Sequence, residues 1–322
     1  MDTRQVLKKK RTPVRLQEEK HKYAVADLLL LITAMVWGFG FVAQRAGMEH
    51  VGPFTFNGIR FLLGGICLLP LCGFRPKNKS IAPDRSGAVS PLKAGFLAGC
   101  LLFCGAGLQQ VGLLYTSAGK AGFITGLYVI FVPVVGLMFG RRTGAGTWIG
   151  ALLATFGMYF LSVRADFTMS AGDLLVLAGA VFWALHVLLL GYLSPRTHPL
   201  RLAMVQFLVC GLFSMIIALY FESFTTREVM AASIPILYGG LGSVGVGYTL
   251  QTVAQRWAHP AHASILLSLE AVFAAVGGWW LLDEVLSNRG LFGCGLMLIG
   301  MLISQLYPLF QKKYFAVIHG LR

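Results

Sequence analysis

Two eleven-residue stretches of the chain match without a gap: residues 27–37 read DLLLLITAMVW and residues 173–183 read DLLVLAGAVFW. Both begin with Asp and end with Trp, and they share three leucines and an alanine. The same offset pairs Pro53 with Pro199 and Phe61 with Phe207, and a slightly shorter one pairs Gly150 with Gly293 and Gly157 with Gly300. Self-similarity at such a long period indicates a fold built from two related halves.

The composition indicates that these halves lie in a membrane. Of 322 residues, 56% are hydrophobic and 12% are charged, about half the ~25% charge of a soluble domain. Because so little charge cannot coat a soluble fold, lipid must be the solvent for much of the surface. The net charge of +14 is spread over the N-terminal tail and the links between apolar runs. This spread argues against nucleic-acid binding, which concentrates basic residues on one face.

Ten apolar stretches are each long enough, at about 20 residues, to cross the hydrocarbon core as a helix. They are residues 24–44, 54–74, 94–114, 118–139, 145–163, 172–193, 200–221, 233–254, 261–282 and 288–309. The expected fold class is therefore an all-α integral membrane protein with ten transmembrane helices.

The number of spans in each half sets how the halves lie in the bilayer. Five helices per repeat mean that the second half enters from the opposite face, the inverted-repeat architecture of many secondary transporters. We expect a basic cytoplasmic tail over 1–23, five-helix repeats over 24–163 and 164–309, and a cytoplasmic tail over 310–322. With the N-terminus inside, cytoplasmic segments hold 21 of the 27 Lys and Arg residues. The positive-inside rule therefore predicts that both termini are cytoplasmic.

Four short segments, taken in order, carry a resemblance to a known family. They are Trp37-Gly38, Asn57-Gly58-Ile59-Arg60-Phe61, the run from Phe123 to Pro133, and Leu269-Glu270 followed by Asp283-Glu284. Together they resemble the drug/metabolite transporter superfamily, in particular its EamA-type members with two five-helix repeats, over about residues 24–309. The chain departs from that pattern at two places, Ala271, where many members have Pro, and Gly140-Arg141-Arg142, where many have Glu.

The resemblance implies a secondary transporter that exports metabolites, amino-acid-like compounds or drugs across the bacterial inner membrane without ATP. The chain has no Gly-rich loop followed by Lys and Ser or Thr for a nucleotide, and neither a cofactor nor a metal is expected. The expected partners are a small-molecule substrate and the lipid bilayer, with no nucleic acid, and the protein is expected to be a monomer or a homodimer. The alternatives are a channel, a sensory scaffold and an intramembrane enzyme. An enzyme needs a nucleophile–base pair or a metal cluster at membrane depth, and no such set of catalytic residues is evident.

Ionisable residues within the spans are the first candidates for a site, because a charge at mid-bilayer costs about 2.5–3.5 kcal/mol. Glu270 lies near the middle of the ninth stretch. It either couples proton flow to substrate movement or holds two helices together by a hydrogen bond. His186, midway along the sixth stretch, is either a packing residue or a functional one. Arg60 and Lys120 either attract an anionic group or pair with an acidic residue, and an ion pair is the favoured interpretation for Arg60.

Neutral polar and aromatic residues within the spans complete the candidate site. The polar ones are Gln109, Gln110, Gln206 and Gln251, and the aromatic ones are Trp37, Tyr128, Trp183 and Tyr248. Amides at this depth suit hydrogen bonding to a substrate or to a neighbouring helix. The rings are either walls of a cavity or ordinary packing and lipid-facing residues.

Two further features remain open on the sequence alone. Pro133 lies deep in the fourth stretch and frees the carbonyl of Val129, so it is either a hinge or a simple kink. His259 and His262 are one helical turn apart, a spacing compatible with a metal, but no Cys or carboxylate lies nearby in the sequence. Snorkelling of both side chains to the interface is therefore the favoured interpretation.

Overall fold

The computed structural model describes residues 13–73, 88–140, 144–162, 170–285 and 287–318, and every element in these ranges is a helix. By length and composition, seven helical segments within these ranges are able to cross a membrane. They are His21–Gly47, Pro53–Cys72, Pro91–Gly112, Ala118–Met138, Ala171–Arg196, Pro199–Phe221 and Pro260–Leu281. The expectation of an all-helical membrane protein is confirmed.

The first half of the chain forms seven helices. They are α1 (Pro13–Gly47), α2 (Pro53–Cys67), α3 (Leu69–Gly73), α4 (Pro91–Gly112), α5 (Ala118–Gly126), α6 (Tyr128–Met138) and α7 (Ala145–Ser162). Because α1 begins at Pro13, part of the expected N-terminal tail is helical, as the Lys, Glu and Gln residues of that stretch favour. Residues 1–12 of that tail and residues 319–322 at the other end lie outside the described residues, as do Arg141 and Arg142.

The second half contains longer and shorter helices in a similar succession. They are α8 (Ala171–Leu193), a 3₁₀ turn (Ser194–Arg196), α9 (Pro199–Phe221), α10 (Thr226–Ala231), α11 (Ser233–Leu237), a π-helix (Tyr238–Tyr248), α12 (Thr249–Ala254), α13 (Pro260–Leu267), α14 (Glu270–Leu281) and α15 (Asn288–Ile318). Helices α2, α4, α9 and α13 all start with Pro, which suits a first turn because its N–H is not needed there.

Several stretches that the sequence predicts as continuous helices are interrupted, and two of these breaks lie near the centre of the bundle. The stretch 118–139 is broken at Leu127, between α5 and α6, and the stretch 261–282 is broken between α13 and α14. Pro133 lies inside α6, in the second turn after the first break. The second break lies at Ser268 and Leu269, next to Ala271, and needs no proline at all. A hinge at Pro133 stays a prediction.

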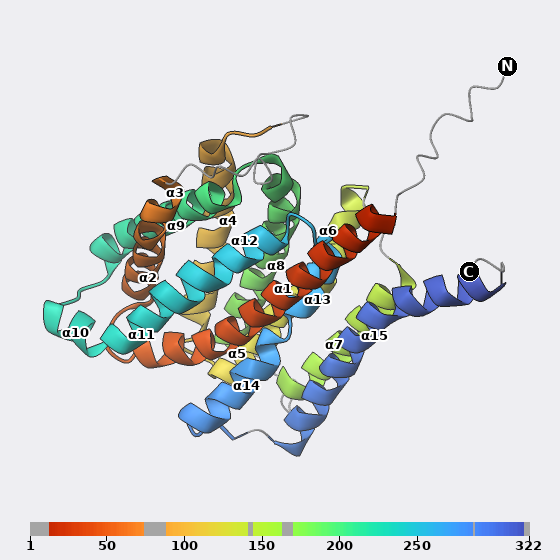
Figure 1. Cartoon of the computed structure of the whole chain (residues 1–322). Helices are drawn as coiled ribbons and strands as arrows, with labels where there is room; N and C mark the ends of the chain where they lie inside the picture. The colour runs from red at the N-terminus through yellow and green to blue at the C-terminus, as the bar shows by residue number, and fades with distance from the viewer. Residues whose placement is uncertain (1–12, 74–87, 141–143, 163–169, 286, 319–322) are drawn as a thin grey trace.

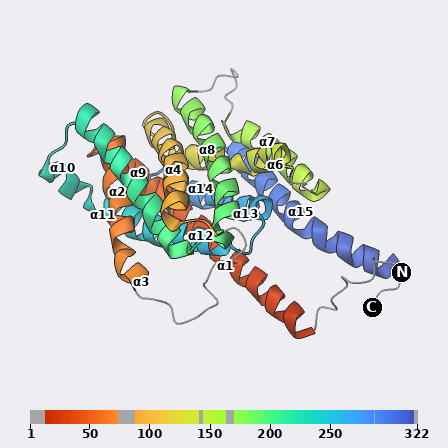
Figure 2. The ribbon, with the colours of Figure 1, turned by 90° about the horizontal axis from the view of Figure 1, so that it is seen from above.

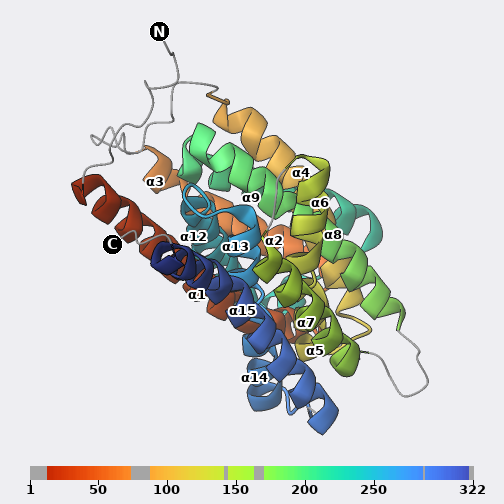
Figure 3. The same ribbon diagram turned by 90° about the vertical axis from the view of Figure 1, so that its right-hand side faces the viewer.

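The helices pack as one bundle with two distinct edges. Figures 1, 2 and 3 show α7 beside α15 along one edge, and Figures 1 and 2 show α2, α9 and α10 at the opposite one. Between these edges, α4 packs against α8 and α9, and α1 packs against α14 and the π-helix. The broken pairs meet as well, because α5 contacts α14 and α6 contacts α13. The two helix breaks therefore lie in the interior of the bundle.

Apolar side chains occupy both the interior and the outside of the bundle. The largest buried cluster surrounds Trp37, Trp183 and Tyr248. On the outside, Met138 and Phe221 are 83% and 82% exposed. Apolar side chains on an outer surface are well solvated by lipid hydrocarbon, which agrees with a membrane-embedded bundle.

Candidate functional site

A small cavity lies at the centre of the bundle, where α1, α2, α4, α5, α6, α8 and α14 approach the π-helix and α12. Its free space of about 20 Å³ has room for about one water molecule. Eight of the twelve candidate site residues line it, namely Trp37, Arg60, Gln109, Tyr128, Trp183, Tyr248, Gln251 and Glu270. The residues that the prediction missed are Phe41, Gln44, Thr125, Val187 and Ser243.

Glu270 is the only carboxyl that lines this cavity in the part of the chain described. It is the first residue of α14, directly after the helix break, and its side chain is buried with the residue only 3% exposed. The partial positive charge of a helix N-terminus favours a carboxylate at this position. Its neighbour is Tyr128, the first residue of α6. Neither Tyr128 Oη nor Glu270 Oε1 forms a well-oriented hydrogen bond with any described residue, so both face the cavity with bonding capacity to spare.

Arg60 of α2 carries the second charge in the cavity wall. The residue is only 1% exposed, so its guanidinium is shielded from bulk water. Its Nε donates to Asn57 Oδ1 at 2.9 Å, and its guanidinium lies 4.8 Å from the ring centre of Phe61 and 5.6 Å from that of Phe56. Within the described ranges no carboxylate pairs with it. The favoured ion pair is therefore replaced by an amide and two aromatic faces, which also stabilise a guanidinium.

A chain of buried amides connects the cavity wall. Trp183 Nε1 donates to Gln109 Oε1 at 2.9 Å, and Thr125 Oγ1 donates to the same oxygen at 3.3 Å. Gln109 Nε2 in turn donates to Gln44 Oε1 at 3.2 Å. On the opposite side, Trp37 Nε1 donates to the backbone carbonyl of Ser243 at 3.2 Å. These bonds hold both indole rings in fixed orientations.

Tyr248 lies between the two indole rings. Its ring centre is 4.4 Å from that of Trp37 and 5.9 Å from that of Trp183, and the second pair is stacked. Phe61 and Phe207 approach the same ring at 5.8 Å and 6.0 Å. The cavity therefore has an aromatic wall suited to an apolar or cationic group.

Two other predicted site residues do not line the cavity but lie just behind its wall: His186 and Gln206. His186 Nε2 lies 2.9 Å from Gln206 Oε1, and Gln206 Nε2 donates to Thr252 Oγ1 at 3.3 Å. The His186 ring meets Trp183 edge-on at 5.9 Å. The contacts support the packing interpretation of His186, whereas its Nδ1 bonds to no described residue.

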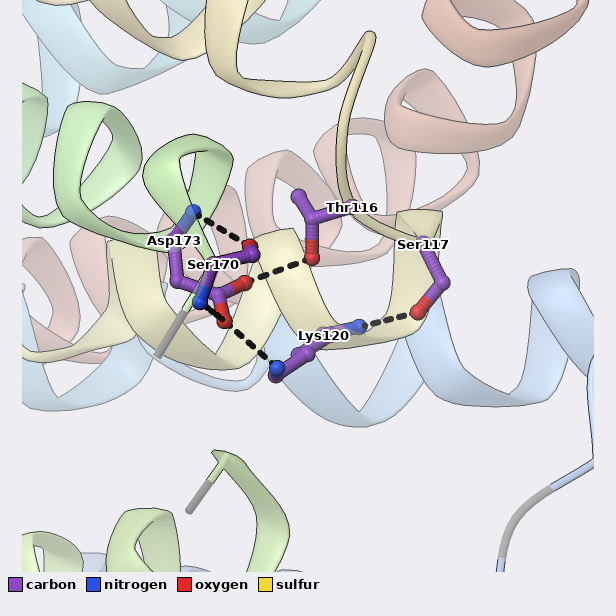
Figure 4. A network of polar contacts seen from close by, with 5 residues as sticks. All are labelled: Thr116, Ser117, Lys120, Ser170 and Asp173. Carbon is purple, nitrogen blue, oxygen red and sulfur yellow. Dashed lines mark hydrogen bonds and ion pairs between the residues drawn. The ribbon is translucent and has the colours of Figure 1, made fainter. Parts of the chain in front are cut away.

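Lys120 forms an ion pair at one end of the bundle (Figure 4). Its Nζ lies 2.5 Å from Asp173 Oδ2, and Thr116 Oγ1 donates to Asp173 Oδ1 at 2.7 Å. The same carboxylate accepts from the backbone N–H of Ser170, the capping residue of α8. Asp173 is fully buried, so the link before α5, α5 itself and the start of α8 meet at this one side chain.

His262 forms a second contact with a carboxylate, that of Asp27 of α1. The distance from His262 Nε2 to Asp27 Oδ1 is 2.8 Å, and both side chains are partly exposed. The expectation that no carboxylate lies near this histidine holds only along the sequence, because Asp27 lies in the first helix of the other half. In the described part of the chain, no three His, Cys, Asp or Glu residues are grouped to hold a metal.

The missed cavity residues gave weak signals in the sequence. Gln44 is the last residue of the first apolar stretch, so it reads as the end of a helix rather than part of a site. Thr125 and Ser243 have small hydroxyl side chains that are common in transmembrane packing. Gln110, by contrast, is buried next to Gln109 but does not line the cavity, and neither of its side-chain polar atoms bonds to a described residue.

An apolar helical bundle closed around a buried aromatic and polar cavity is the arrangement of a multi-pass membrane transporter. The EamA-like transporter family model matches residues 24–163 and again residues 170–306, and the chain belongs to this family. It is therefore a membrane-embedded protein of a family of small-molecule transporters.

Curated relatives agree with this membership, and a solved structure is similar in fold. An uncharacterized transporter of Archaeoglobus fulgidus is 31% identical over 295 residues, which cover 88% of this chain and 87% of that protein. The uncharacterized inner membrane transporter YedA of Escherichia coli K12 is 24% identical, with 84% and 88% covered. A solved crystal structure superimposes with a TM-score of 0.68 over 88% of this chain and 97% of that one. Its sequence identity of 18% makes it similar in fold alone.

Proposed function

We propose that this protein is a secondary active transporter that exports small organic molecules by alternating access and holds them in the central cavity. The observation that carries this proposal is the pair of opposite charges, Glu270 and Arg60, buried in one cavity wall without an ion pair between them. A carboxyl, a guanidinium and aromatic faces suit a substrate with an ammonium, a carboxylate and an apolar part. Amino-acid-like compounds and cationic drugs have this chemistry.

Two inverted repeats, 24–163 and 164–309, with five spans each, are the proposed architecture. The helix starts support it, because the interval from Ala118 of α5 to Pro260 of α13 equals the interval from Tyr128 of α6 to Glu270 of α14. Helix packing supports it too. Helix α4 of the first half packs on α8 of the second, and α1 of the first half packs in the same way on the π-helix and α12. Equivalent helices of the two halves also pair with each other, α2 with α9 and α7 with α15.

Matched side-chain contacts give stronger support than helix lengths. The ring of Trp183 lies over Gly105 of α4, and the ring of Trp37 lies over Gly247 of the π-helix. The two tryptophans end the two matched stretches, and Gly247 follows Gly105 by the same interval that separates the starts of α5 and α13. A chance repeat in apolar sequence would not reproduce a contact between two separate elements.

The Asp27–His262 and Asp173–Lys120 contacts also lie at matched positions of the two halves. Asp27 and Asp173 begin the two matched stretches, and their partners His262 and Lys120 are each the third residue of their helix, α13 and α5. In an inverted repeat, equivalent contacts lie at opposite faces of the membrane. With both termini in the cytoplasm, Asp27–His262 lies at the inner end and Asp173–Lys120 at the outer end. Each end of the cavity would then have its own contact to break when that end opens.

Proton coupling through Glu270 is the proposed source of energy for export from a bacterial cell across its inner membrane. A carboxyl that is buried and short of hydrogen-bond donors changes its charge only by exchanging a proton. A substrate that competes with this proton for Glu270 would move against it as the cavity opens to one face and then to the other.

The test uses purified protein in liposomes with an imposed pH gradient. Thermal-shift screening against amino acids, nucleosides, sugars and cationic drugs first identifies a ligand, because bound ligand stabilises the folded state. Glu270→Gln should abolish the response of transport to the pH gradient, while counterflow of the ligand continues. Glu228→Gln, at an exposed carboxylate outside the cavity, is the matched control and should behave as wild type.

Two results would contradict the proposal. Undiminished pH-driven transport in Glu270→Gln would exclude this residue as the coupling group. Flux that neither saturates nor shows counterflow would favour a channel over a carrier.

A further inference from the structure

A second, larger cavity opens on the outside of the bundle between α4, α6 and α8. Its volume is about 460 Å³, and its lining is aliphatic and aromatic: Leu101, Phe139, Leu185, Leu188, Leu189 and Tyr192. Phe139 and Tyr192 at its mouth are 71% and 48% exposed. Because the outside of a transmembrane bundle faces hydrocarbon at this depth, the natural occupant is an acyl chain.

An arginine lies at the end of this cavity. The guanidinium of Arg196 is 4.1 Å from the ring centre of Tyr192, one of the lining residues, and its Nη1 donates to the backbone carbonyl of Tyr192 at 2.7 Å. Among the described residues no carboxylate pairs with it. A guanidinium has five N–H donors in a planar fork, so most of them stay free for an anionic group such as a phosphate.

Other positive groups gather at the same end of the bundle. Arg201, in the first turn of α9, and Arg256, just after α12, both act on His198, which closely follows Arg196 in the chain. Partial burial lowers the pKa of His198 most, and the positive charges of these two arginines lower it further. One carboxylate at the end where α1 begins, Asp27, is in contact with His262. The field at the end of the cavity therefore favours an anion.

The sequence explains why the cavity is open here. At the matched place in the second half, α14 closes on α1 because Gly277 lets Val42 and Phe39 approach within 2.9 and 3.1 Å of where its Cβ would be. The residue at the equivalent place in α6 is Val135, which carries a branched side chain. A branched side chain on α6 takes up space that is empty on α14, which favours a wider gap between α6 and α8.

We infer that the cavity between α4, α6 and α8 binds one anionic phospholipid, with an acyl chain against Leu185 and Leu188 and its phosphate on Arg196. The site stands whether or not the proposed transport is correct. The proposed orientation assigns it to the cytoplasmic leaflet, where anionic headgroups attract basic residues near the surface.

The test is lipid binding to the full-length purified protein by native mass spectrometry, with dioleoyl phosphatidylglycerol and dioleoyl phosphatidylcholine as probes. Wild type should bind one phosphatidylglycerol more tightly than phosphatidylcholine. Arg196→Gln should weaken phosphatidylglycerol about fivefold, the factor that corresponds to about 1 kcal/mol for one basic residue. Arg289→Gln is the matched control, because Arg289 also lies over aromatic rings, those of Tyr159 and Phe160.

The cavity itself is tested by filling it. Leu185→Trp should reduce tight binding of both lipids, whereas Leu212→Trp, at an exposed position on α9, should not. Melting temperatures close to wild type show that each variant is folded. Unchanged phosphatidylglycerol binding in Arg196→Gln, equal binding of the two lipids, or no effect of Leu185→Trp would overturn the proposal. Competition by glycerol phosphate at equal concentration would also overturn it, since it would show a free phosphate site instead.

Discussion

The two cavity tryptophans, Trp37 and Trp183, each pack against a glycine, and the space at these two glycines differs. A Cβ added at Gly247 would lie 2.6 Å from Trp37 Nε1, whereas one at Gly105 would lie 3.2 Å from the Trp183 ring. The first distance is too short for any real contact, so Trp37 would have to move. The second requires a shift of only a few tenths of an ångström.

This difference predicts unequal effects of one added methyl group. Gly247→Ala should lower the stability of the protein by about 1–3 kcal/mol, the usual cost of overpacking a core, and Gly105→Ala should cost less. Thermal melting in a single detergent measures both. Gly295→Ala is the control, because nothing lies within 4 Å of its added Cβ. Equal melting temperatures for all three variants would contradict the contact geometry.

At the scale of helices, two carboxylates tie the ends of separate elements together. Glu284, after α14, accepts from the backbone N–H groups of Ala118 and Gly119 at 2.8 and 3.0 Å, in the first turn of α5. Glu222, after α9, accepts in the same way from Phe54 and Thr55 in the first turn of α2. Each carboxylate thus caps a helix far away in the sequence, where the helix dipole favours negative charge.

Removing either charge should loosen one helix start and leave the other unchanged. Glu284→Gln should cost about 1 kcal/mol, since a hydrogen bond to a partly exposed charged group is lost. Hydrogen exchange should become faster at the first turn of α5 but not of α2, and Glu222→Gln should show the reverse. Faster exchange in both helices in either variant would mean that the ends are not independent.

How far the sequence predicts these elements depends on the range of the interactions. Hydropathy is a property of neighbouring residues, so the membrane helices are predictable, and short motifs such as Asn57–Phe61 make the family predictable as well. The break at Leu127 is not, because no Gly-Pro or similar turn signal stands there and the bend depends on contacts with other helices. The role of Gln44 is not predictable either, because it stands at the end of an apolar run and its hydrogen bond to Gln109 forms between separate helices. Lys120 and Asp173 belong to different helices, α5 and α8, and meet only after folding.

At the scale of the whole molecule, the two matched ion pairs are expected to set the balance between inward-open and outward-open states. A ligand or mutation shifts such a balance by its different effect on the two states. Under the proposed orientation and mechanism, loss of the Asp173–Lys120 contact would weaken the closed outer end, and loss of the Asp27–His262 contact would weaken the closed inner end.

Opposite shifts are therefore predicted for two similar substitutions. With Ser243→Cys in the cavity wall as a reporter, a membrane-impermeant maleimide added outside intact cells measures access from the outer face. Asp173→Asn should increase labelling of this cysteine, and Asp27→Asn should decrease it. Changes of the same sign in both variants would mean that the pairs only stabilise the fold, and would argue against alternating access.

The surroundings of Arg60 have a consequence for biogenesis. Its hydrogen-bond partner Asn57 and both stacking rings, Phe56 and Phe61, belong to α2 itself. These partners are therefore available to the guanidinium as soon as α2 is synthesised, before α9 and the π-helix exist. These contacts lower the free-energy penalty for inserting the charge into hydrocarbon, so α2 is expected to stay in the membrane until the later helices are inserted.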